Sequence, residues 1–284
     1  MKNDEFYIGW MGKAPKTFAS TIKKYVLILL PVIIVLGVLL ALSQKKFDTG
    51  NFEFGKLTEV KGIYFNTPVP NLKVINGKDI WGNENYITVP LIGYGKHGAD
   101  GIMDELQKEQ NTSFIGKEIV LKGTLLYNDG KLLMQVDGND KPFVKISNSN
   151  VDKNDLPKLT QLGAMDVKGE IVDPKCFFGV MKPGEGKPHK DCAIRCILGG
   201  IPPVLKVTDN EGKQNYYLIV GEHGEKMNEA VQDYVATLVN IHAKAIEYGD
   251  WIVLYVQQNG LQHYSYISEH YENEIAMCGK NCVK

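Results

Sequence analysis

The sequence predicts a mainly β protein with short helices, in which one transmembrane helix precedes two tandem copies of a small β-barrel module. Three observations support this prediction: an uncharged apolar run, an internal repeat in the chain that follows it, and a cysteine-bearing insertion in the second copy of that repeat. The 284 residues are 44% hydrophobic and 23% charged, which is ordinary for a folded protein and argues against wholesale disorder.

The apolar run covers residues 25–42 and contains no charge. As a helix it spans roughly 27 Å, close to the thickness of a bilayer core. Pro31 would kink this helix, which lipid-embedded helices tolerate. We therefore predict a transmembrane helix. A signal peptide cleaved near Ala41-Leu-Ser43 is the alternative, but 24 residues ahead of the apolar run are long for one.

Lysines flank the apolar run unequally. Five precede it, and only Lys45 and Lys46 follow it closely. Under the positive-inside rule, the N-terminus then lies in the cytoplasm and the bulk of the chain outside the membrane.

The chain beyond the helix repeats itself, because four motifs recur in the same order. The pairs are residues 60–62 with 167–169 (VKG in both), 72–74 with 205–207 (LKV in both), 91–98 with 218–224, and 115–136 with 235–256. The offset is 107 residues for the first pair (from position 60 to 167) and 133 for the second (from 72 to 205). Four matches in register indicate a duplication.

Each copy predicts three strands, a short helix and a closing hairpin. The hairpin turns at Asn128-Asp-Gly130 in the first copy and at Tyr248-Gly-Asp250 in the second. Asp-Gly supplies the positive φ angles of a tight turn. Five strands with a helix between the third and fourth are the element order of an OB-like barrel. The predicted parts are a cytoplasmic segment (1–24), a transmembrane helix (25–43), a first OB-like module (52–146), a linker (147–162), a second module (163–258) and a tail (259–284).

The second module carries an insertion. The offset between the copies grows from 107 to 133, so 133 − 107 = 26 residues are added, within 173–203. Residues 191–198 predict a short helix that ends at Gly199-Gly200, with Cys192 and Cys196 on one face. Because loops lengthen at little thermodynamic cost and often carry function, we expect this insertion to be the working part.

Four side chains of the insertion are candidate metal ligands: Cys176, His189, Cys192 and Cys196. Thiolate and imidazole suit zinc, copper(I) or an iron–sulfur centre, so a single such centre is the cofactor expected if these side chains bind a metal. Reactive thiols are a further alternative.

Disulfides are the favoured alternative to a metal, because cysteines outside the cytoplasm usually pair. Cys176 would pair with Cys192 or Cys196, and the leftover thiol with Cys278 or Cys282. The total of five cysteines leaves at least one thiol without a partner in the same chain.

The sequence lacks the motifs of common enzyme classes and the charge expected of a nucleic-acid binder. The chain has no Gly-rich phosphate loop, no Gly-x-Ser-x-Gly and no His-Glu-x-x-His, so no catalytic constellation is assigned. His97 and His223 occupy matching places beside a turn glycine, where duplication explains them better than ligation. With 32 basic and 33 acidic residues the net charge is −1, which argues against nucleic acid as a partner.

The insertion resembles a known motif. The run VDPKCFFGVMKPGEGKPHKDCAIRC at 172–196, followed by GGIPP at 199–203, is similar to a motif of bacterial single-pass inner-membrane proteins that we associate loosely with membrane redox machinery. The resemblance implies a bacterial inner-membrane protein facing the periplasm, and it implies no activity.

Together these features favour a non-catalytic accessory subunit of a bacterial membrane complex, of a redox or respiratory kind. Its expected partners are other subunits of that complex and the lipid bilayer, with no nucleic acid. The alternative function is a periplasmic metal-binding or electron-transfer protein that uses the Cys/His loop.

Overall fold

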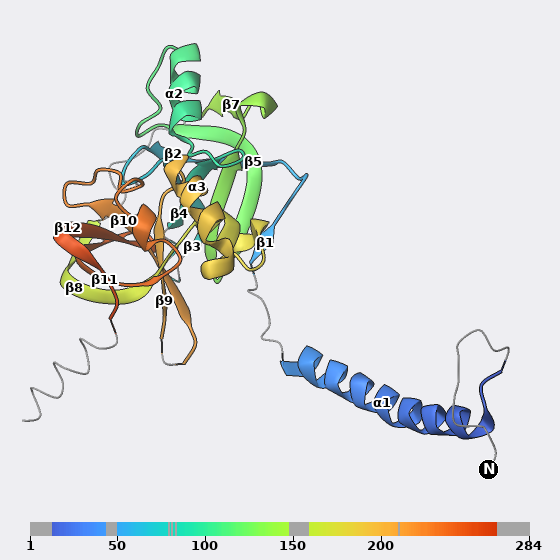
Figure 1. The fold of residues 1–284 in the computed structure, drawn as a ribbon. Coiled ribbons are helices and arrows are strands. Elements are labelled where there is room, and N and C mark those ends of the chain that lie inside the picture. The colour runs from blue at the N-terminus through green and yellow to red at the C-terminus, as the bar shows by residue number, and fades with distance from the viewer. Residues whose placement is uncertain are drawn as a thin grey trace, which may run out of the picture. The chain divides into compact units, whose positions relative to one another are not determined.

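The computed structural model describes residues 13–43, 50–78, 80, 82, 84–147, 159–209 and 211–265. The chain divides into two units, Met1–Phe47 and Asp48–Lys284. The first unit contains helix α1, and the second contains all the described strands (Figure 1). Residues 148–158 of the predicted linker and residues 266–284 of the tail, with Cys278 and Cys282, lie outside the described residues.

Helix α1 runs from Lys16 to Ser43 and includes Pro31. It is long and apolar enough to span a membrane, by length and composition, and none of its residues is buried. It begins ahead of the predicted boundary, because residues 16–24 continue the helix on the N-terminal side of the apolar run.

The second unit begins with a five-stranded barrel. Its strands are β2 (Thr58–Phe65), β3 (Asn71–Lys78), β4 (Glu84–Gly93), β5 (Glu118–Asn128) and β6 (Lys131–Val136). The spatial order is β2-β3-β4-β6-β5, and β5 pairs back with β2. All neighbours are antiparallel except β4 and β6. Helix α2 (Asp100–Glu109) lies between the third and fourth strands, and the short strands β1 (Asn51–Phe52) and β7 (Phe143–Ile146) pair with β5.

The second barrel repeats this topology. Its strands are β8 (Leu159–Val172), β9 (Val204–Thr208), β10 (Gln214–Gly221), β11 (Leu238–Tyr248) and β12 (Trp251–His263). They close in the order β8-β9-β10-β12-β11, and again the third and fifth strands are parallel. The short helix predicted between the third and fourth strands of this copy is only a 3-10 turn, Gln232–Tyr234. The predicted fold class, tandem OB-like barrels after an apolar helix, is confirmed.

The VKG and LKV motifs repeat because the barrel needs the same close approach in both copies. A Cβ on Gly62 would lie 2.8 Å from the carbonyl oxygen of Lys73, and one on Gly169 would lie 2.5 Å from that of Lys206. Both distances are too short for a side chain, so glycine is required where the first strand crosses the second.

The third sequence match is displaced by one residue. Gly93 pairs with Val136 at the end of the parallel ladder, and Gly221 pairs with Val256 in the same place. Leu91 therefore corresponds to Ile219, and the apparent match of Leu91 with Leu218 places the two side chains on opposite faces of the strand.

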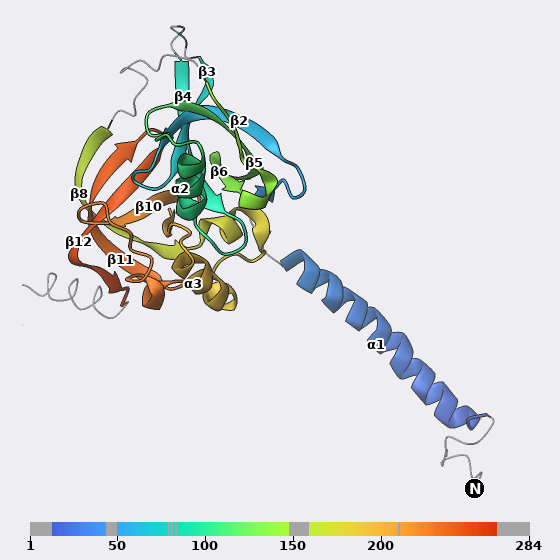
Figure 2. The ribbon, with the colours of Figure 1, turned by 90° about the horizontal axis from the view of Figure 1, so that it is seen from above.

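The two barrels share a hydrophobic cluster, here called the seam. The first barrel contributes Val69, Ile92, Leu126 and Leu133, the insertion contributes Cys176, Phe177, Phe178, Cys196 and Ile201, and the second barrel contributes residues that include Tyr216 and Trp251. Phe178 stacks on Trp251, with ring centroids 6.4 Å apart. The barrels lie side by side with α3 (Lys190–Leu198) of the insertion near both (Figure 2). The insertion thus fills space between the barrels.

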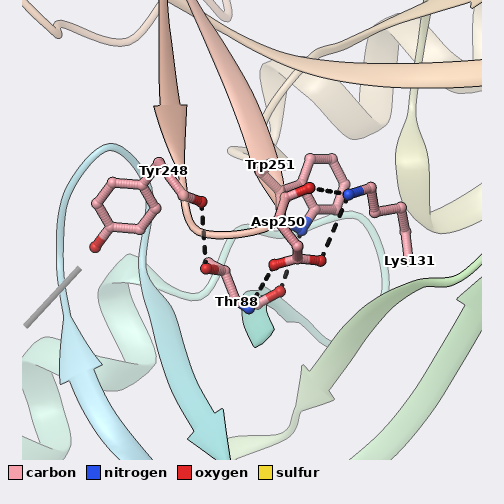
Figure 3. A network of polar contacts seen from close by, with 5 residues as sticks. All are labelled: Thr88, Lys131, Tyr248, Asp250 and Trp251. Carbon is pink, nitrogen blue, oxygen red and sulfur yellow. Dashed lines mark hydrogen bonds and ion pairs between the residues drawn. The ribbon is translucent and has the colours of Figure 1, made fainter. Parts of the chain in front are cut away.

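The last hairpin of the second barrel docks on β4 of the first (Figure 3). The indole Nε1 of Trp251 donates to the carbonyl oxygen of Thr88 at 3.1 Å, and the Thr88 amide donates to Asp250 Oδ1 at 2.6 Å. Lys131 donates to the Asp250 carbonyl oxygen and lies 3.4 Å from its carboxylate. These bonds and the seam position the two barrels against each other.

Candidate metal centre

The insertion begins with a tight turn that aims Cys176 inward. After β8, the Phe177 amide donates to the Asp173 carbonyl oxygen at 3.0 Å, which opens a single π-helical turn, Cys176–Val180. Gly179 lies inside this turn with a φ of 151°, a conformation that favours glycine. The chain then doubles back, and Gly184 passes so close to the backbone of Phe177 that a Cβ would lie 2.6 Å away.

Helix α3 presents two faces. Ala193 and Ile197 belong to the core of the second barrel, whereas Cys192 and Cys196 pack toward the seam. Residues four apart lie one turn above each other on a helix, so the two thiols face the same way. The predicted helix is confirmed, and Gly199 follows its last residue as predicted.

The three thiols converge. The Sγ atoms of Cys176, Cys192 and Cys196 all lie within 4.8 Å of one another. Cys176 and Cys196 are buried, whereas Cys192 is only partly buried and gives solvent a route to the group. All three are free thiols, so neither predicted disulfide of Cys176 is formed.

His189 belongs to a second group. Its ring nitrogen, the Cys176 Sγ and a carboxylate oxygen of Asp173 lie within 4.8 Å of one another. His189 and Asp173 are 3% and 0% exposed, and His189 Nε2 and Asp173 Oδ2 find no hydrogen-bond partner among the described residues. Burial lowers the pKa of His189, so its ring is available in the neutral form that binds metals. These two buried polar atoms without a partner are free to contact a ligand.

A cation from the first barrel touches the thiols. The Nζ of Lys96, in the loop between β4 and α2, lies 3.0 Å from Cys192 Sγ and 3.6 Å from Cys196 Sγ. The hydrogen bond with Cys192 raises the pKa of Lys96, which keeps the ammonium charged. Lys175, which is buried, donates to the carbonyl oxygens of Gly93, at the end of β4, and of Gly95 in the loop, at 2.8 and 2.7 Å.

The hydrogen bond between Cys176 and Cys196 shifts the pKa values of the two thiols in opposite directions. A hydrogen bond with Cys196, burial and the charge of Asp173 raise the pKa of Cys176. The same hydrogen bond lowers the pKa of Cys196, and the nearby ammonium of Lys96 adds to this effect. Cys176 therefore holds its proton as a donor while Cys196 accepts as the more thiolate-like sulfur.

The predicted ligands are thus brought together around Cys176. His97 and His223 are exposed and belong to neither ligand group. Sequence reasoning missed Asp173 and Lys96. Asp173 directly follows β8, at the start of the insertion, and this position could have identified it as a candidate ligand. No sequence pattern connects Lys96 with a helix almost a hundred residues later.

No protein-family model matches the chain, and no curated protein matches its sequence. Among solved structures, a deletion mutant of the single-stranded DNA binding protein from Thermus aquaticus matches at 13% identity over 77% of this chain and 89% of that chain, with a TM-score of 0.18. The OB-like assignment therefore rests on the strand order of the two barrels, and this match assigns no ligand.

The match does correct the partner prediction, which named other membrane subunits and the lipid bilayer and excluded nucleic acid. Its exclusion of nucleic acid is what the match contradicts, because the matched structure is that of a single-stranded DNA binding protein; the match says nothing about membrane partners. The physical error lies in arguing from net charge. A sum over the whole chain does not describe the charge on any one face of the protein.

Proposed function

We propose that this protein is a membrane-anchored metal-binding protein whose insertion holds one thiophilic ion, Zn²⁺ or Cu⁺. The observation that carries this proposal is the convergence of three sulfur atoms within 4.8 Å of one another. For tetrahedral coordination at about 2.3 Å per bond, two thiolates on one zinc lie roughly 3.8 Å apart, so a small contraction would bring all three onto one ion.

The spacing favours a single ion over a cluster. A cluster of several irons and inorganic sulfides fills more space than sulfur atoms within 4.8 Å of one another leave between them. Thiolate ligands prefer zinc and copper(I) among the metals that bind as single ions. Asp173 and His189 adjoin Cys176 and are the side chains available for a fourth bond.

The surroundings also suit a metal. The insertion is held by both barrels, so its ligands are positioned by packing, and Cys192 leaves a route for the ion from solvent. The apolar helix α1 supports anchoring in a membrane. We also propose that the bulk of the chain lies in the periplasm. The motif resemblance to inner-membrane redox proteins supports this location. The role of an accessory subunit stays a prediction.

The test is metal analysis of the full chain, purified in detergent with a thiol reductant and without chelators, and then dialysed against Zn²⁺ or Cu⁺. We expect close to one ion per chain, lost in Cys176→Ser, Cys192→Ser and Cys196→Ser. The matched control is the double variant Cys278→Ser/Cys282→Ser, which should bind as the unaltered chain does. Peptide mapping under non-reducing conditions, on chain isolated from cells without reductant, shows whether Cys176 forms a disulfide. The proposal fails if the unaltered chain takes up no metal, or if Cys176 is recovered in a disulfide from cells.

A further inference from the structure

Lys96 is an unexpected neighbour for a group of metal ligands. It comes from the first barrel, whereas the thiols belong to the insertion in the second, and its Nζ contacts the sulfurs of both Cys192 and Cys196. The residue is otherwise exposed to solvent, and its ammonium lies against Cys192, the partly buried member of the three thiols.

The backbone around Lys96 is tied to the insertion at several points. The Gly98 amide donates to the Gly199 carbonyl oxygen at 3.0 Å, and a Cβ on Gly98 would collide with the backbone of Gly200. Lys175 reaches from the insertion to the carbonyl oxygens of Gly93 and Gly95. Contacts on both sides of position 96 fix the loop, so the approach of the ammonium to the sulfurs is set by the docking of the barrels.

The ammonium of Lys96 can compensate negative charge on the metal ligands. Three thiolates and the Asp173 carboxylate bring four negative charges into a largely buried site. A divalent ion cancels two of them, and the ammonium of Lys96, 3.0 Å from Cys192 Sγ, offsets a third. Because uncompensated buried charge is costly, a site that lacked Lys96 would hold its thiolates, and therefore its metal, less tightly.

We infer that Lys96 is a positioning residue of the metal site, supplied by the first barrel, which compensates the charge of the thiolate ligands so that the ion is bound across both barrels. Lys96 does not bind the ion. It donates hydrogen bonds to ligand sulfurs, as the outer partners of metal ligands commonly do. This inference rests on the proposed function, and it makes the first barrel necessary for metal affinity.

The test uses Co²⁺ as a coloured substitute for Zn²⁺ on the reduced, metal-free full chain in detergent. Lys96→Met and Lys96→Gln should each weaken Co²⁺ binding by about 10- to 100-fold and shift the sulfur-to-cobalt absorption band, because the sulfurs lose a hydrogen bond. Lys96→Arg should restore most of the affinity and the band. Lys226→Met is the matched control, because it removes an ion pair between the barrels, with Asp100 at 2.8 Å, that touches no sulfur.

The outcomes separate the two claims. If the unaltered chain binds neither Co²⁺ nor Zn²⁺, the proposed function fails and this inference with it. If the unaltered chain binds and both uncharged variants at position 96 bind equally well with the same spectrum, only the inference is overturned. It is also overturned if Lys96→Arg is as weak as Lys96→Met, or if Lys226→Met loses as much affinity, since docking alone would then explain the effect. Thermal unfolding of the metal-free variants shows whether a loss of affinity reflects a loss of fold.

Discussion

Gly199 offers a sharp test of how the two barrels meet. It follows α3 with φ −72°, a conformation that alanine adopts readily, so substitution brings no backbone strain. A Cβ at this position would collide with the carbonyl oxygen of Lys96 and lie 3.2 Å from that of Arg195. The perturbation is therefore one methyl group placed in the contact between the insertion and the first barrel.

The magnitude follows from two opposing effects. Overpacking a closely packed contact costs about 1–3 kcal/mol, while alanine in place of glycine returns about 0.4–1 kcal/mol by restricting the unfolded chain. For Gly199→Ala we expect a net loss of about 1–2 kcal/mol. For a unit of this size each kcal/mol lowers the melting temperature by about 2–4 °C, so a fall of about 2–8 °C should be seen.

The assay is thermal unfolding of the full chain in detergent, followed by circular dichroism. Gly101→Ala is the matched control, because Gly101 lies in α2 and its Cβ would have no heavy atom within 4 Å. This control should melt at the same temperature as the unaltered chain, or slightly higher. A Gly199→Ala protein that melts no lower than Gly101→Ala would refute the described contact between Lys96 and the end of α3.

Three further predictions concern the seam and the metal. Trp251→Phe keeps an aromatic ring in the seam but leaves the Thr88 carbonyl oxygen without its donor, so we expect a loss of about 1–3 kcal/mol in urea unfolding, and no change would contradict the bond. Phe178→Ala removes a fully buried ring and should cost about 3–5 kcal/mol in the same measurement, while a cost below 1 kcal/mol would mean that the seam is not packed as described. Chelation should lower the melting temperature of the metal-loaded chain, by an amount that corresponds to about 2.7 kcal/mol when free metal exceeds Kd 100-fold, and it should not affect Cys192→Ser.

The fold was predictable where geometry requires particular residues. The glycine of each VKG motif is fixed by the approach of a neighbouring carbonyl, so the motif survives in both copies and reveals the repeat. The Asp-Gly turn was recognisable because both Asp129 and Gly130 have positive φ angles, 44° and 77°. The sequence match paired Leu91 with Leu218, one position away from its true counterpart Ile219. Apolar residues on a strand can replace one another, so their identity does not fix the alignment as the glycines do.

The site was predictable only within the insertion. Spacing on a helix placed Cys192 and Cys196 together, since their relation is local. Lys96 was not predictable, because its position depends on the docking of two barrels, which no local pattern encodes. His189 was predicted as a ligand beside all three thiols, whereas the structure groups it with Asp173 and Cys176.

The seam also limits how this protein can be dissected. A fragment that begins at β8 would retain every described cysteine, yet it would expose Phe178 and Trp251 and leave the sulfurs without their neighbouring ammonium. Because the seam buries side chains from both barrels, replacing either barrel alone would expose apolar side chains of the other.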